Sequence, residues 1–553
     1  MTGTDQAANR TENGARRSAH PAVVLLIIAG AQLMIVLDAT IVNIALPSMG
    51  GYFHKNQTDM TWALNAYTLA FGGLLLLGGR LGDILERRRM FIVGLGLFTL
   101  GSFLGGLATN FEFLLFGRVV QGLGGAIASP TALSLITTSF EEGKERNRAI
   151  SVYAAVSGAG AALGLLLGGV LTQSLSWRWV LFVNLPIGAV LMGGAFMYLH
   201  ESPRLQGKFD IIGTVLSVAG MLDLVYAFIH VAHDGWGNTS TYTLFPSAVI
   251  LLVAFVFYEA KMAAEPLMPM RIFENRSRSG AYFVMLVVGA AMFGMFYFIT
   301  FFTQQVLGYG PLKCGLAFLP VALTIGVTSQ VVAGLLPKLG PKALIAFGTT
   351  LLTVSMLWLS RVSAASGYLD TILPGMIVLA ISMGFVFVPI TSVAVSKVQD
   401  TDAGLASALL NVGQQVGGAI GLSVLATVFA TAARDFAKSN LDRLNAAVGT
   451  LPGNLQGSVG QFLKGTGENG PQPEQVTSFV KTQSPTDQPI VSYFFGPKGA
   501  YQHMFASHVE AHGAGMGFLA AAAFAIVAAI VAWVVINVKK EDLPTGSEAM
   551  VAV

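Results

Sequence analysis

Long apolar segments, separated by short polar ones, follow one another along most of the chain. About fourteen of them are long enough to cross a bilayer, because a helix of about 20 apolar residues spans the hydrocarbon core. They fall near residues 21–46, 61–79, 90–108, 112–138, 148–173, 179–199, 211–232, 243–260, 280–303, 314–336, 343–361, 371–395, 403–432 and 513–537. The pattern predicts an all-α polytopic membrane protein. It is least regular in the seventh and eighth segments, which contain Asp223 and flank the polar stretch 233–242.

Positive charges gather in alternate loops. One set of loops and tails holds Arg16, Arg17, Arg80, Arg87, Arg88, Arg89, Lys144, Arg146, Arg148, Arg204, Lys208, Arg271, Arg276, Arg278, Lys338, Lys342, Lys397, Lys539 and Lys540, and the other short loops hold Lys55, Arg178, Lys313 and Arg361. Lys and Arg favour the cytoplasmic side of a membrane. We therefore predict that both termini are cytoplasmic.

The polar segment 433–512 then lies outside the membrane. Its Gly, Pro, Gln, Ser and Thr content predicts a partly irregular loop with short helices, of which 433–448 extends the thirteenth helix. His503, His508 and His512 lie there, and the last two are spaced to bind zinc from one helix face. Close histidines in an interfacial segment are more often incidental, so we predict no metal.

Composition narrows the class of protein. Of 553 residues, 54% are hydrophobic and 11% charged, against about 25% charged in soluble domains. The 64 glycines suit close helix packing in a membrane. A net charge of +3 gives no reason to expect nucleic acid, and one cysteine, Cys314, excludes a disulfide framework. Residues 1–20 are polar and no small-residue cleavage site follows, so the first helix is expected to be retained.

One carboxylate lies inside the first apolar segment, at Asp38. A charged Asp at the centre of a membrane helix costs about 2.5–3.5 kcal/mol, so it needs a partner, a cavity or water. Burial favours the neutral form of a carboxylate, which is how such a group takes up and releases a proton. Asp38 is therefore interpreted as a proton carrier, with a merely packed carboxylate as the alternative.

A polar, glycine-rich stretch follows the second helix: Gly79-Arg80-Leu81-Gly82-Asp83-Ile84-Leu85-Glu86-Arg87-Arg88-Arg89. Glycine permits a tight cytoplasmic turn, and Asp83 is suited to accept hydrogen bonds from the N-terminus of a neighbouring helix. The arginines suit acidic groups or lipid phosphates. A positive-inside loop without further function is the alternative.

These residues resemble the cytoplasmic helix 2–3 signature of the major facilitator superfamily. The sequence 114–126, with Arg118 and Gln121, resembles its helix-four motif, in which an intramembrane arginine assists proton transfer. Gly160, Gly164, Gly168 and Gly169 match the helix-five packing motif of its antiporters. Segments 37–47, 177–188, 305–311 and 403–419 are similar to the fourteen-helix drug:proton antiporters of the EmrB/QacA type. The resemblance covers about residues 21–432 and the last helix.

Three departures from the family pattern stand out. Leu165 replaces the proline of the antiporter motif, which removes its expected bend. Glu86 and Ile84 replace a glycine and a basic residue of the cytoplasmic signature. In the second half, the segment Gly334–Lys342 weakly resembles that signature and contains no acidic residue.

The resemblance implies two six-helix halves that rock around a site near the membrane midplane. Residues 1–20 are then a cytoplasmic tail, 21–200 the N-terminal half, 201–278 an extra two-helix insertion with linkers, 279–537 the C-terminal half with the loop 433–512, and 538–553 a second cytoplasmic tail. Asp38 and Arg118 are the implied proton-coupling pair. Gly79, Asp83, Arg87 and Arg88 form the implied cytoplasmic gate, with Asp83 docking at Thr401-Asp402-Ala403.

Polar residues in apolar helices are candidates for the substrate cavity: Asn43, Asn65, Tyr67, Gln121, Gln304, Asn411 and Gln414. Hydrogen bonds between helices explain any one of them equally well. Asp223 is interpreted as an end-of-helix charge rather than a second titratable site.

The expected function is proton-coupled multidrug efflux, in which amphipathic or cationic drugs or antibiotics leave by alternating access. An exporter of an endogenous lipid or metabolite is the alternative, and a membrane enzyme or receptor is the remote one. The sequence has no Gly-x-Ser-x-Gly, His-Glu-x-x-His or phosphate-binding loop, so we expect no enzyme and no cofactor. The expected partners are small substrates, protons and membrane lipids. The protein is expected to work as a monomer in a bacterial inner membrane.

Overall fold

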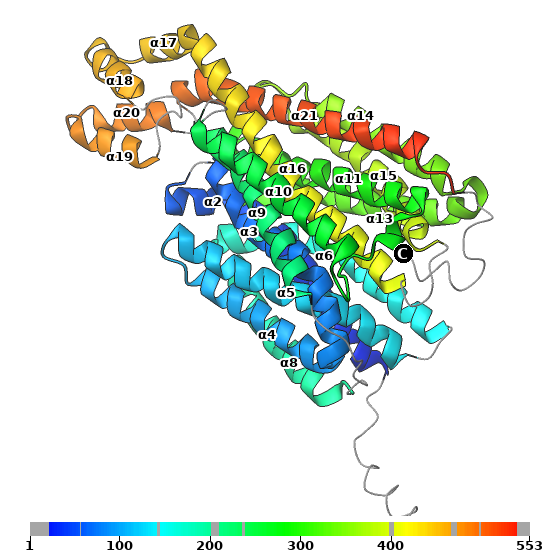
Figure 1. The fold of residues 1–553 in the computed structure, drawn as a ribbon. Coiled ribbons are helices and arrows are strands. Elements are labelled where there is room, and N and C mark those ends of the chain that lie inside the picture. Colours follow the sequence, from blue (N-terminus) through cyan, green and yellow to red (C-terminus); the bar gives the residue numbers. More distant parts are fainter. Residues whose placement is uncertain are drawn as a thin grey trace, which may run out of the picture.

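The computed structural model describes residues 21–55, 57–140, 144–200, 210–234, 238–396, 403–465, 473–496 and 499–538, and the side chain of Asp83 lies outside this part. The described residues form helices and no strand (Figure 1). Thirteen of the helices are long and apolar enough to cross a membrane, and α6 (Lys144–Ser174), with 31 residues, is a fourteenth long helix. The prediction of an all-α protein with about fourteen spans is confirmed.

The first group of helices comprises α2 (Pro21–Phe53), α3 (Gln57–Leu85), α4 (Arg87–Gly106), α5 (Phe111–Ser139), α6, the short α7 (Trp179–Phe182) and α8 (Asn184–Tyr198). Within it α4 and α3 pack on α5, and α2 packs on α6. The close approach of α4 and α5 depends on glycine. A Cβ on Gly101 would stand 2.4 Å from the backbone nitrogen of Gln121, and one on Gly124 would stand 2.2 Å from the backbone nitrogen of Phe98.

The second group comprises α11 (Arg276–Phe301), α12 (Pro311–Ala317), α13 (Leu319–Leu339), α14 (Pro341–Leu359), α15 (Leu373–Val395), α16 (Ala403–Ser439) and α21 (Ser507–Val534). One π-helical turn, η2 (Phe302–Val306), ends α11, and another, η3 (Tyr368–Ile372), begins α15. The two groups meet where α3 packs on α16 and where α12 packs on α6, and α11 also contacts α2. The Gln304 amide donates to the Ile44 carbonyl (3.0 Å), and the Leu312 N–H donates to the Gln173 side chain (3.1 Å).

The helix pair α9 (Ile211–Asp234) and α10 (Thr239–Lys261) lies across the seam between the two groups (Figure 1). Helix α9 packs on α3 and on α16, and a small apolar cluster of Leu69, Val225, Ile229 and Ala419 fills this junction. A 3-10 turn, η1 (Met270–Phe273), leads on to α11. The two segments with the least regular pattern are therefore full-length helices.

Four short helices, α17 (Leu441–Gly449), α18 (Gly453–Gly465), α19 (Pro473–Thr482) and α20 (Gln488–Phe495), project from one end of the bundle (Figure 1). They share their own apolar core, which includes Leu455, Val459 and Phe494. The π-helical turn η6 (Gln502–Ala506) leads into α21. The segment is more ordered than its composition predicts, because apolar residues recur at helical spacing between its glycines and prolines. Helix α16 ends at Ser439, short of the predicted extension to 448.

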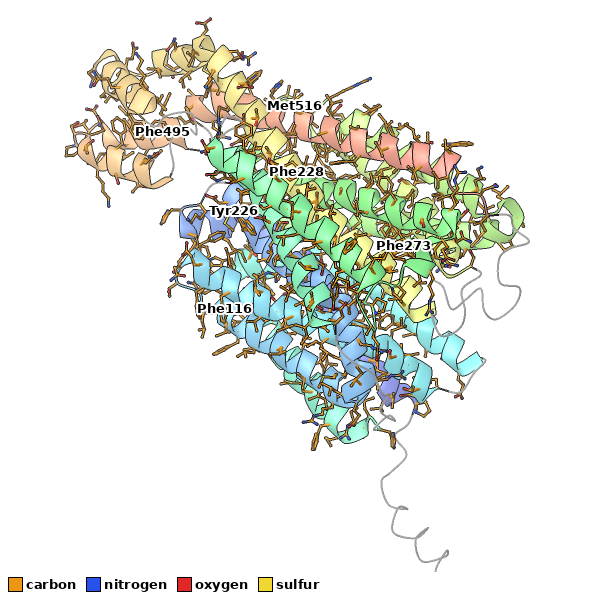
Figure 2. All side chains as sticks on the ribbon, viewed as in Figure 1. Phe116, Tyr226, Phe228, Phe273, Phe495 and Met516 are labelled. Carbon is orange, nitrogen blue, oxygen red and sulfur yellow. The ribbon has the colours of Figure 1, made fainter. Side chains whose placement is uncertain are left out.

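The outer surface of the bundle is apolar. Large hydrophobic side chains are exposed on it, among them Leu323 on α13, Trp533 on α21 and Phe116 on α5, which Figure 2 shows pointing outward. Soluble proteins rarely expose apolar surface on this scale. Together with the length of the helices, this surface suits a multi-pass membrane protein.

Candidate functional site

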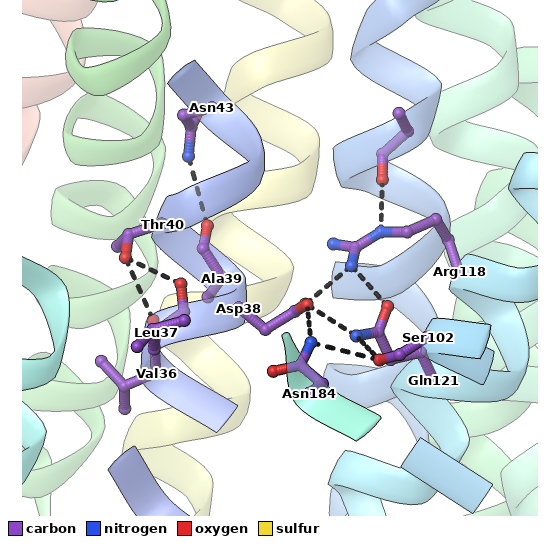
Figure 3. Close-up of polar contacts among 11 residues, drawn as sticks. Val36, Leu37, Asp38, Ala39, Thr40, Asn43, Ser102, Arg118, Gln121 and Asn184 are labelled. Atoms are coloured by element: carbon purple, nitrogen blue, oxygen red, sulfur yellow. Dashed lines mark hydrogen bonds and ion pairs between the residues drawn. The ribbon is translucent and has the colours of Figure 1, made fainter. Parts of the chain in front are cut away.

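A fully buried ion pair lies inside the first helix group. Arg118 Nη1 on α5 is 2.7 Å from Asp38 Oδ2 on α2, and neither side chain exposes more than 1% of its surface (Figure 3). Removing one partner from such a pair leaves a buried charge without compensation, which is strongly destabilising. The structure brings together the two charged residues that the sequence singled out.

Three uncharged side chains complete the hydrogen bonding around the ion pair. Gln121 donates to Asp38 Oδ1 (2.6 Å) and accepts from Arg118 Nη1 (2.6 Å). Asn184 donates to the same Asp38 oxygen (2.8 Å), and Gln121 and Asn184 both donate to Ser102 Oγ (2.7 and 3.2 Å; Figure 3). Asp38 therefore accepts hydrogen bonds from three N–H donors.

Four helices besides α2 hold these residues. Arg118 and Gln121 are three residues apart on α5, so they share one face; Ser102 comes from α4, and Asn184 begins α8. Helix α3 supplies the Ala63 carbonyl, which accepts from Arg118 Nε (2.9 Å), and the Tyr67 ring, whose centroid is 4.4 Å from the Arg118 guanidinium carbon. The Arg118 guanidinium is therefore held by α3 as well as by Asp38 and Gln121.

The network keeps spare hydrogen-bonding capacity. Arg118 Nη2, Asn184 Oδ1 and the Tyr67 hydroxyl are buried and have no hydrogen-bond partner among the described residues. Buried polar groups are normally paired. The arrangement thus has a donor and acceptors available beside a carboxylate, which suits the exchange of a proton or a water molecule.

A stripe of glycine on α6 lets it lie against α2 beside Asp38. A Cβ on Gly164 would stand 2.0 Å from the Thr40 hydroxyl oxygen, and one on Gly168 would stand 2.7 Å from the Ile41 carbonyl oxygen. Gly160 faces α2 one turn earlier, whereas Gly169 faces Pro311 on α12. Helix α6 continues without interruption through Leu165, where the family pattern has proline.

The cytoplasmic signature forms a junction of one residue between α3 and α4. Glu86 has a φ of 89°, a backbone conformation that suits the glycine expected at this place. Arg88 donates to the Phe196 carbonyl (2.6 Å), Arg80 pairs with Glu265, and a Cβ on Gly79 would contact Pro130. The side chain of Asp83 and its predicted docking residues 401–402 lie outside the described part, so its role stays a prediction.

The seven residues named for the cavity do not gather in one place. Gln121 and Tyr67 belong to the ion-pair network, Asn65 donates to Ser423 on α16 (3.0 Å), and Gln304 bonds to α2. Asn43 donates to its own helix at Ala39 (3.2 Å). On α16, Asn411 is exposed and Gln414 Nε2 lies 3.9 Å from the Met292 sulfur.

Two further candidates lie away from the network. Asp223, in the middle of α9, accepts from Ser247 of α10 and so lies within the helix pair rather than at a helix end, contrary to our interpretation. The His512 ring of α21 stacks on Phe436 of α16, with centroids 4.5 Å apart. The side chain of His503 lies outside the described part.

Sequence reasoning did not single out Ser102 or Asn184 as members of the site. Asn184 lies in the segment 177–188 that carries the family resemblance, and its position in an apolar helix is the one signal that marks it. Ser102 gives no such signal, because serine is common in packed membrane helices.

Comparison with known proteins places the chain in a family. Residues 28–422 match the Major Facilitator Superfamily. The chain is 41% identical over 408 residues to the puromycin resistance protein pur8 of Streptomyces alboniger, an alignment that covers 73% of this chain and 81% of the relative. It is 39% identical to the cephamycin export protein CmcT of Amycolatopsis lactamdurans, covering 73% and 84%.

The fold agrees with solved structures. A bacterial homologue of the human lysosomal transporter Spinster, in an inward-facing and unoccupied conformation, superposes with a TM-score of 0.59 at 17% identity, over 96% of this chain and 100% of that one. Sequence and fold lead to one conclusion: the chain belongs to the Major Facilitator Superfamily and is a multi-pass membrane transport protein.

Proposed function

We propose that the protein exports amphipathic or cationic antibiotics and drugs in exchange for protons. The observation that carries the proposal is the Asp38–Arg118 pair, fully buried in an apolar bundle and held by Gln121 and Asn184. Charged groups at such a depth are costly and mark ion or proton pathways. The two relatives named for puromycin resistance and cephamycin export support antibiotics as the substrate class.

In this proposal, proton coupling follows from the hydrogen bonds that Asp38 accepts. Arg118, Gln121 and Asn184 each donate a hydrogen bond to the Asp38 carboxylate. A movement of α2 relative to α5 and α8 that breaks these bonds loads a proton, and their return releases it. One charge moved through 100 mV supplies about 2.3 kcal/mol.

The moving parts are the two helix groups. In this proposal 21–200 and 279–537 are the rocking halves, 201–278 is an insertion at their seam, and Gly79, Asp83, Arg87 and Arg88 close the inner gate. In this proposal the contacts at Gln304 and Leu312 lie at the outer ends of the halves, and the substrate enters from the inner side. Asn411 and Gln414 on α16 are the proposed contacts for that substrate.

The setting follows from charge and family. We place the protein in a bacterial inner membrane, with both termini cytoplasmic and the helices α17–α20 outside. One chain contains both helix groups, so a monomer suffices for the proposed cycle.

The test is transport into inside-out vesicles with an acidified lumen. Wild-type protein should accumulate ethidium and puromycin only while the gradient lasts, and Asp38→Asn should reduce this to the level of vesicles without the protein. Asp223→Asn is the matched control, because Asp223 is also an intramembrane carboxylate but bonds to Ser247 outside the network.

Each outcome has a clear meaning. Accumulation that ignores both the gradient and the Asp38 substitution would refute proton coupling. Absence of any accumulation across a panel of antibiotics would refute drug export and favour an endogenous lipid or metabolite.

A further inference from the structure

Two buried carboxyl groups face each other at one end of the α9–α10 pair, far along the chain from the ion-pair network. Asp210 immediately precedes α9, and Glu259 lies in the last turn of α10. Their exposed fractions are 7% and 4%. Both are buried to a degree that acidic residues almost never reach without a partner.

One oxygen of each group has an ordinary structural role. Asp210 Oδ1 accepts from the Gly213 N–H (2.8 Å), the usual bond of an N-cap residue. Glu259 Oε2 accepts from the Met268 N–H (3.0 Å) in the linker after α10. These bonds fix both side chains in place.

The other two oxygens point into one small space. Asp210 Oδ2 and Glu259 Oε1 are buried and have no hydrogen-bond partner among the described residues. A Cβ on Gly213 would stand 2.5 Å from each of them, so the glycine leaves the gap into which both point. The Tyr258 hydroxyl interacts with Asp210 through a side-chain hydrogen bond, and no cation is among the described groups that act on Glu259.

Two ionised carboxylates in such a place would repel each other and lack solvation. A single shared proton removes both problems, because the protonated group donates to its ionised neighbour. We propose that Asp210 and Glu259 form a second proton-binding site, which holds one proton between Oδ2 and Oε1.

The site is connected to the cytoplasmic signature through the linker. Glu259 holds the Met268 N–H, and three residues earlier Glu265 pairs with Arg80 at the inner end of α3. Loss of the proton drives the ends of α9 and α10 apart and releases the linker that positions Glu265. The occupancy of this site therefore adjusts the inner end of the seam between the two helix groups.

Infrared spectroscopy of the purified full-length protein tests the site without any transport assay. In an Asp38→Asn background at neutral pH, the C=O band of a protonated carboxylic acid should be present, and Asp210→Asn and Glu259→Gln should each remove the same component. Glu274→Gln, at an exposed residue of the same region, is the control and should retain it. Retention of the full band in both pair variants would overturn the proposal.

Thermal unfolding against pH gives an independent check. The folded protein holds a proton that the unfolded chain releases at neutral pH, so the melting temperature should fall as pH rises. This slope should diminish in Asp210→Asn and in Glu259→Gln by the same amount. An unchanged slope in both variants, or a melting temperature that responds to Mg²⁺ instead of pH, would refute a shared proton.

Discussion

The two six-helix groups treat buried polarity in different ways. In the first group, side chains from separate helices bond to one another around Asp38 and Arg118. In the described part of the second group, buried hydroxyls mostly bond to carbonyls of their own helix, as Thr303 does with Ile299 and Thr349 with Ile345. The first group therefore contains a buried side-chain network between helices, in addition to bonds within single helices such as that of Thr131 to Ile127.

The helix junctions α3–α4 and α13–α14 show a matching contrast between the two groups. Each joins two helices through one residue with a positive φ: Glu86 between α3 and α4 (89°), and Gly340 between α13 and α14 (77°). Glycine adopts this conformation freely, whereas a glutamate stores strain. The first group thus combines a buried ion pair with a strained junction, whereas the second has a glycine at the matching junction.

The strongest test of this difference between the groups is to remove the positive charge of Arg118. We expect Arg118→Met to destabilise the purified protein by about 3–5 kcal/mol, because Asp38 is left buried without its partner. The double variant Asp38→Asn/Arg118→Met should recover part of this loss without recovering transport. Denaturant unfolding measures the stabilities. A double variant as unstable as the single one would contradict the ion-pair account.

An uncharged member of the network should have the next largest effect. Asn184→Leu removes a hydrogen bond to a charged carboxylate and should cost about 1.5–3 kcal/mol. Thr349→Val in α14 is the counterpart in the second group and should cost about 1 kcal/mol or less, since its hydroxyl bonds to carbonyls of its own helix. Equal losses in the same unfolding assay would remove the distinction between the groups.

Helix packing offers a third contrast. Gly164→Ala places a methyl group against Thr40 and the α2 backbone, and should destabilise by about 1–3 kcal/mol. Gly326→Ala on α13, where a Cβ meets nothing within 4 Å, should leave the melting temperature unchanged or slightly higher. Equal melting temperatures for the two alanine variants would contradict the role of Gly164 in the α2–α6 contact.

The smallest expected effect is at the junctions. Glu86→Gly should be more stable than Glu86→Ala by about 1 kcal/mol, because both lack the carboxylate and only glycine relieves the strain. Gly340→Ala should be destabilised by a similar amount. Melting temperatures of the three variants, measured side by side, decide this point.

Charge explains how much of the site the sequence could predict. Asp38 is conspicuous in an apolar helix and needs a partner, a cavity or water, and the family resemblance of residues 114–126 points to Arg118 as that partner. Ser102 and Asn184 belong to a large set of polar residues that pack between helices, and only the α4–α5–α8 geometry selects them. The Asp210–Glu259 pair is not predictable for another reason: acids at helix ends are expected to be solvated.

In the fold, too, the features that follow from apolar periodicity could be predicted, and those that depend on tertiary packing could not. Apolar runs predict the helices, although their ends differ, as where α2 continues to Phe53 and α21 begins at Ser507. The pattern predicts only a partly irregular segment at α17–α20, because each of these helices is too short and polar to stand out alone. Their shared core appears only when the chain folds back on itself.

The length of α16 has a mechanical consequence. Its 37 residues extend roughly 55 Å at 1.5 Å per residue, well beyond a hydrocarbon core of about 30 Å. The helix therefore acts as a lever arm: a small tilt within the membrane becomes a larger displacement at its far end, where α17–α20 are attached. A pair of fluorescent labels, one on these helices and one at the Gly106 end of α4, would report that displacement.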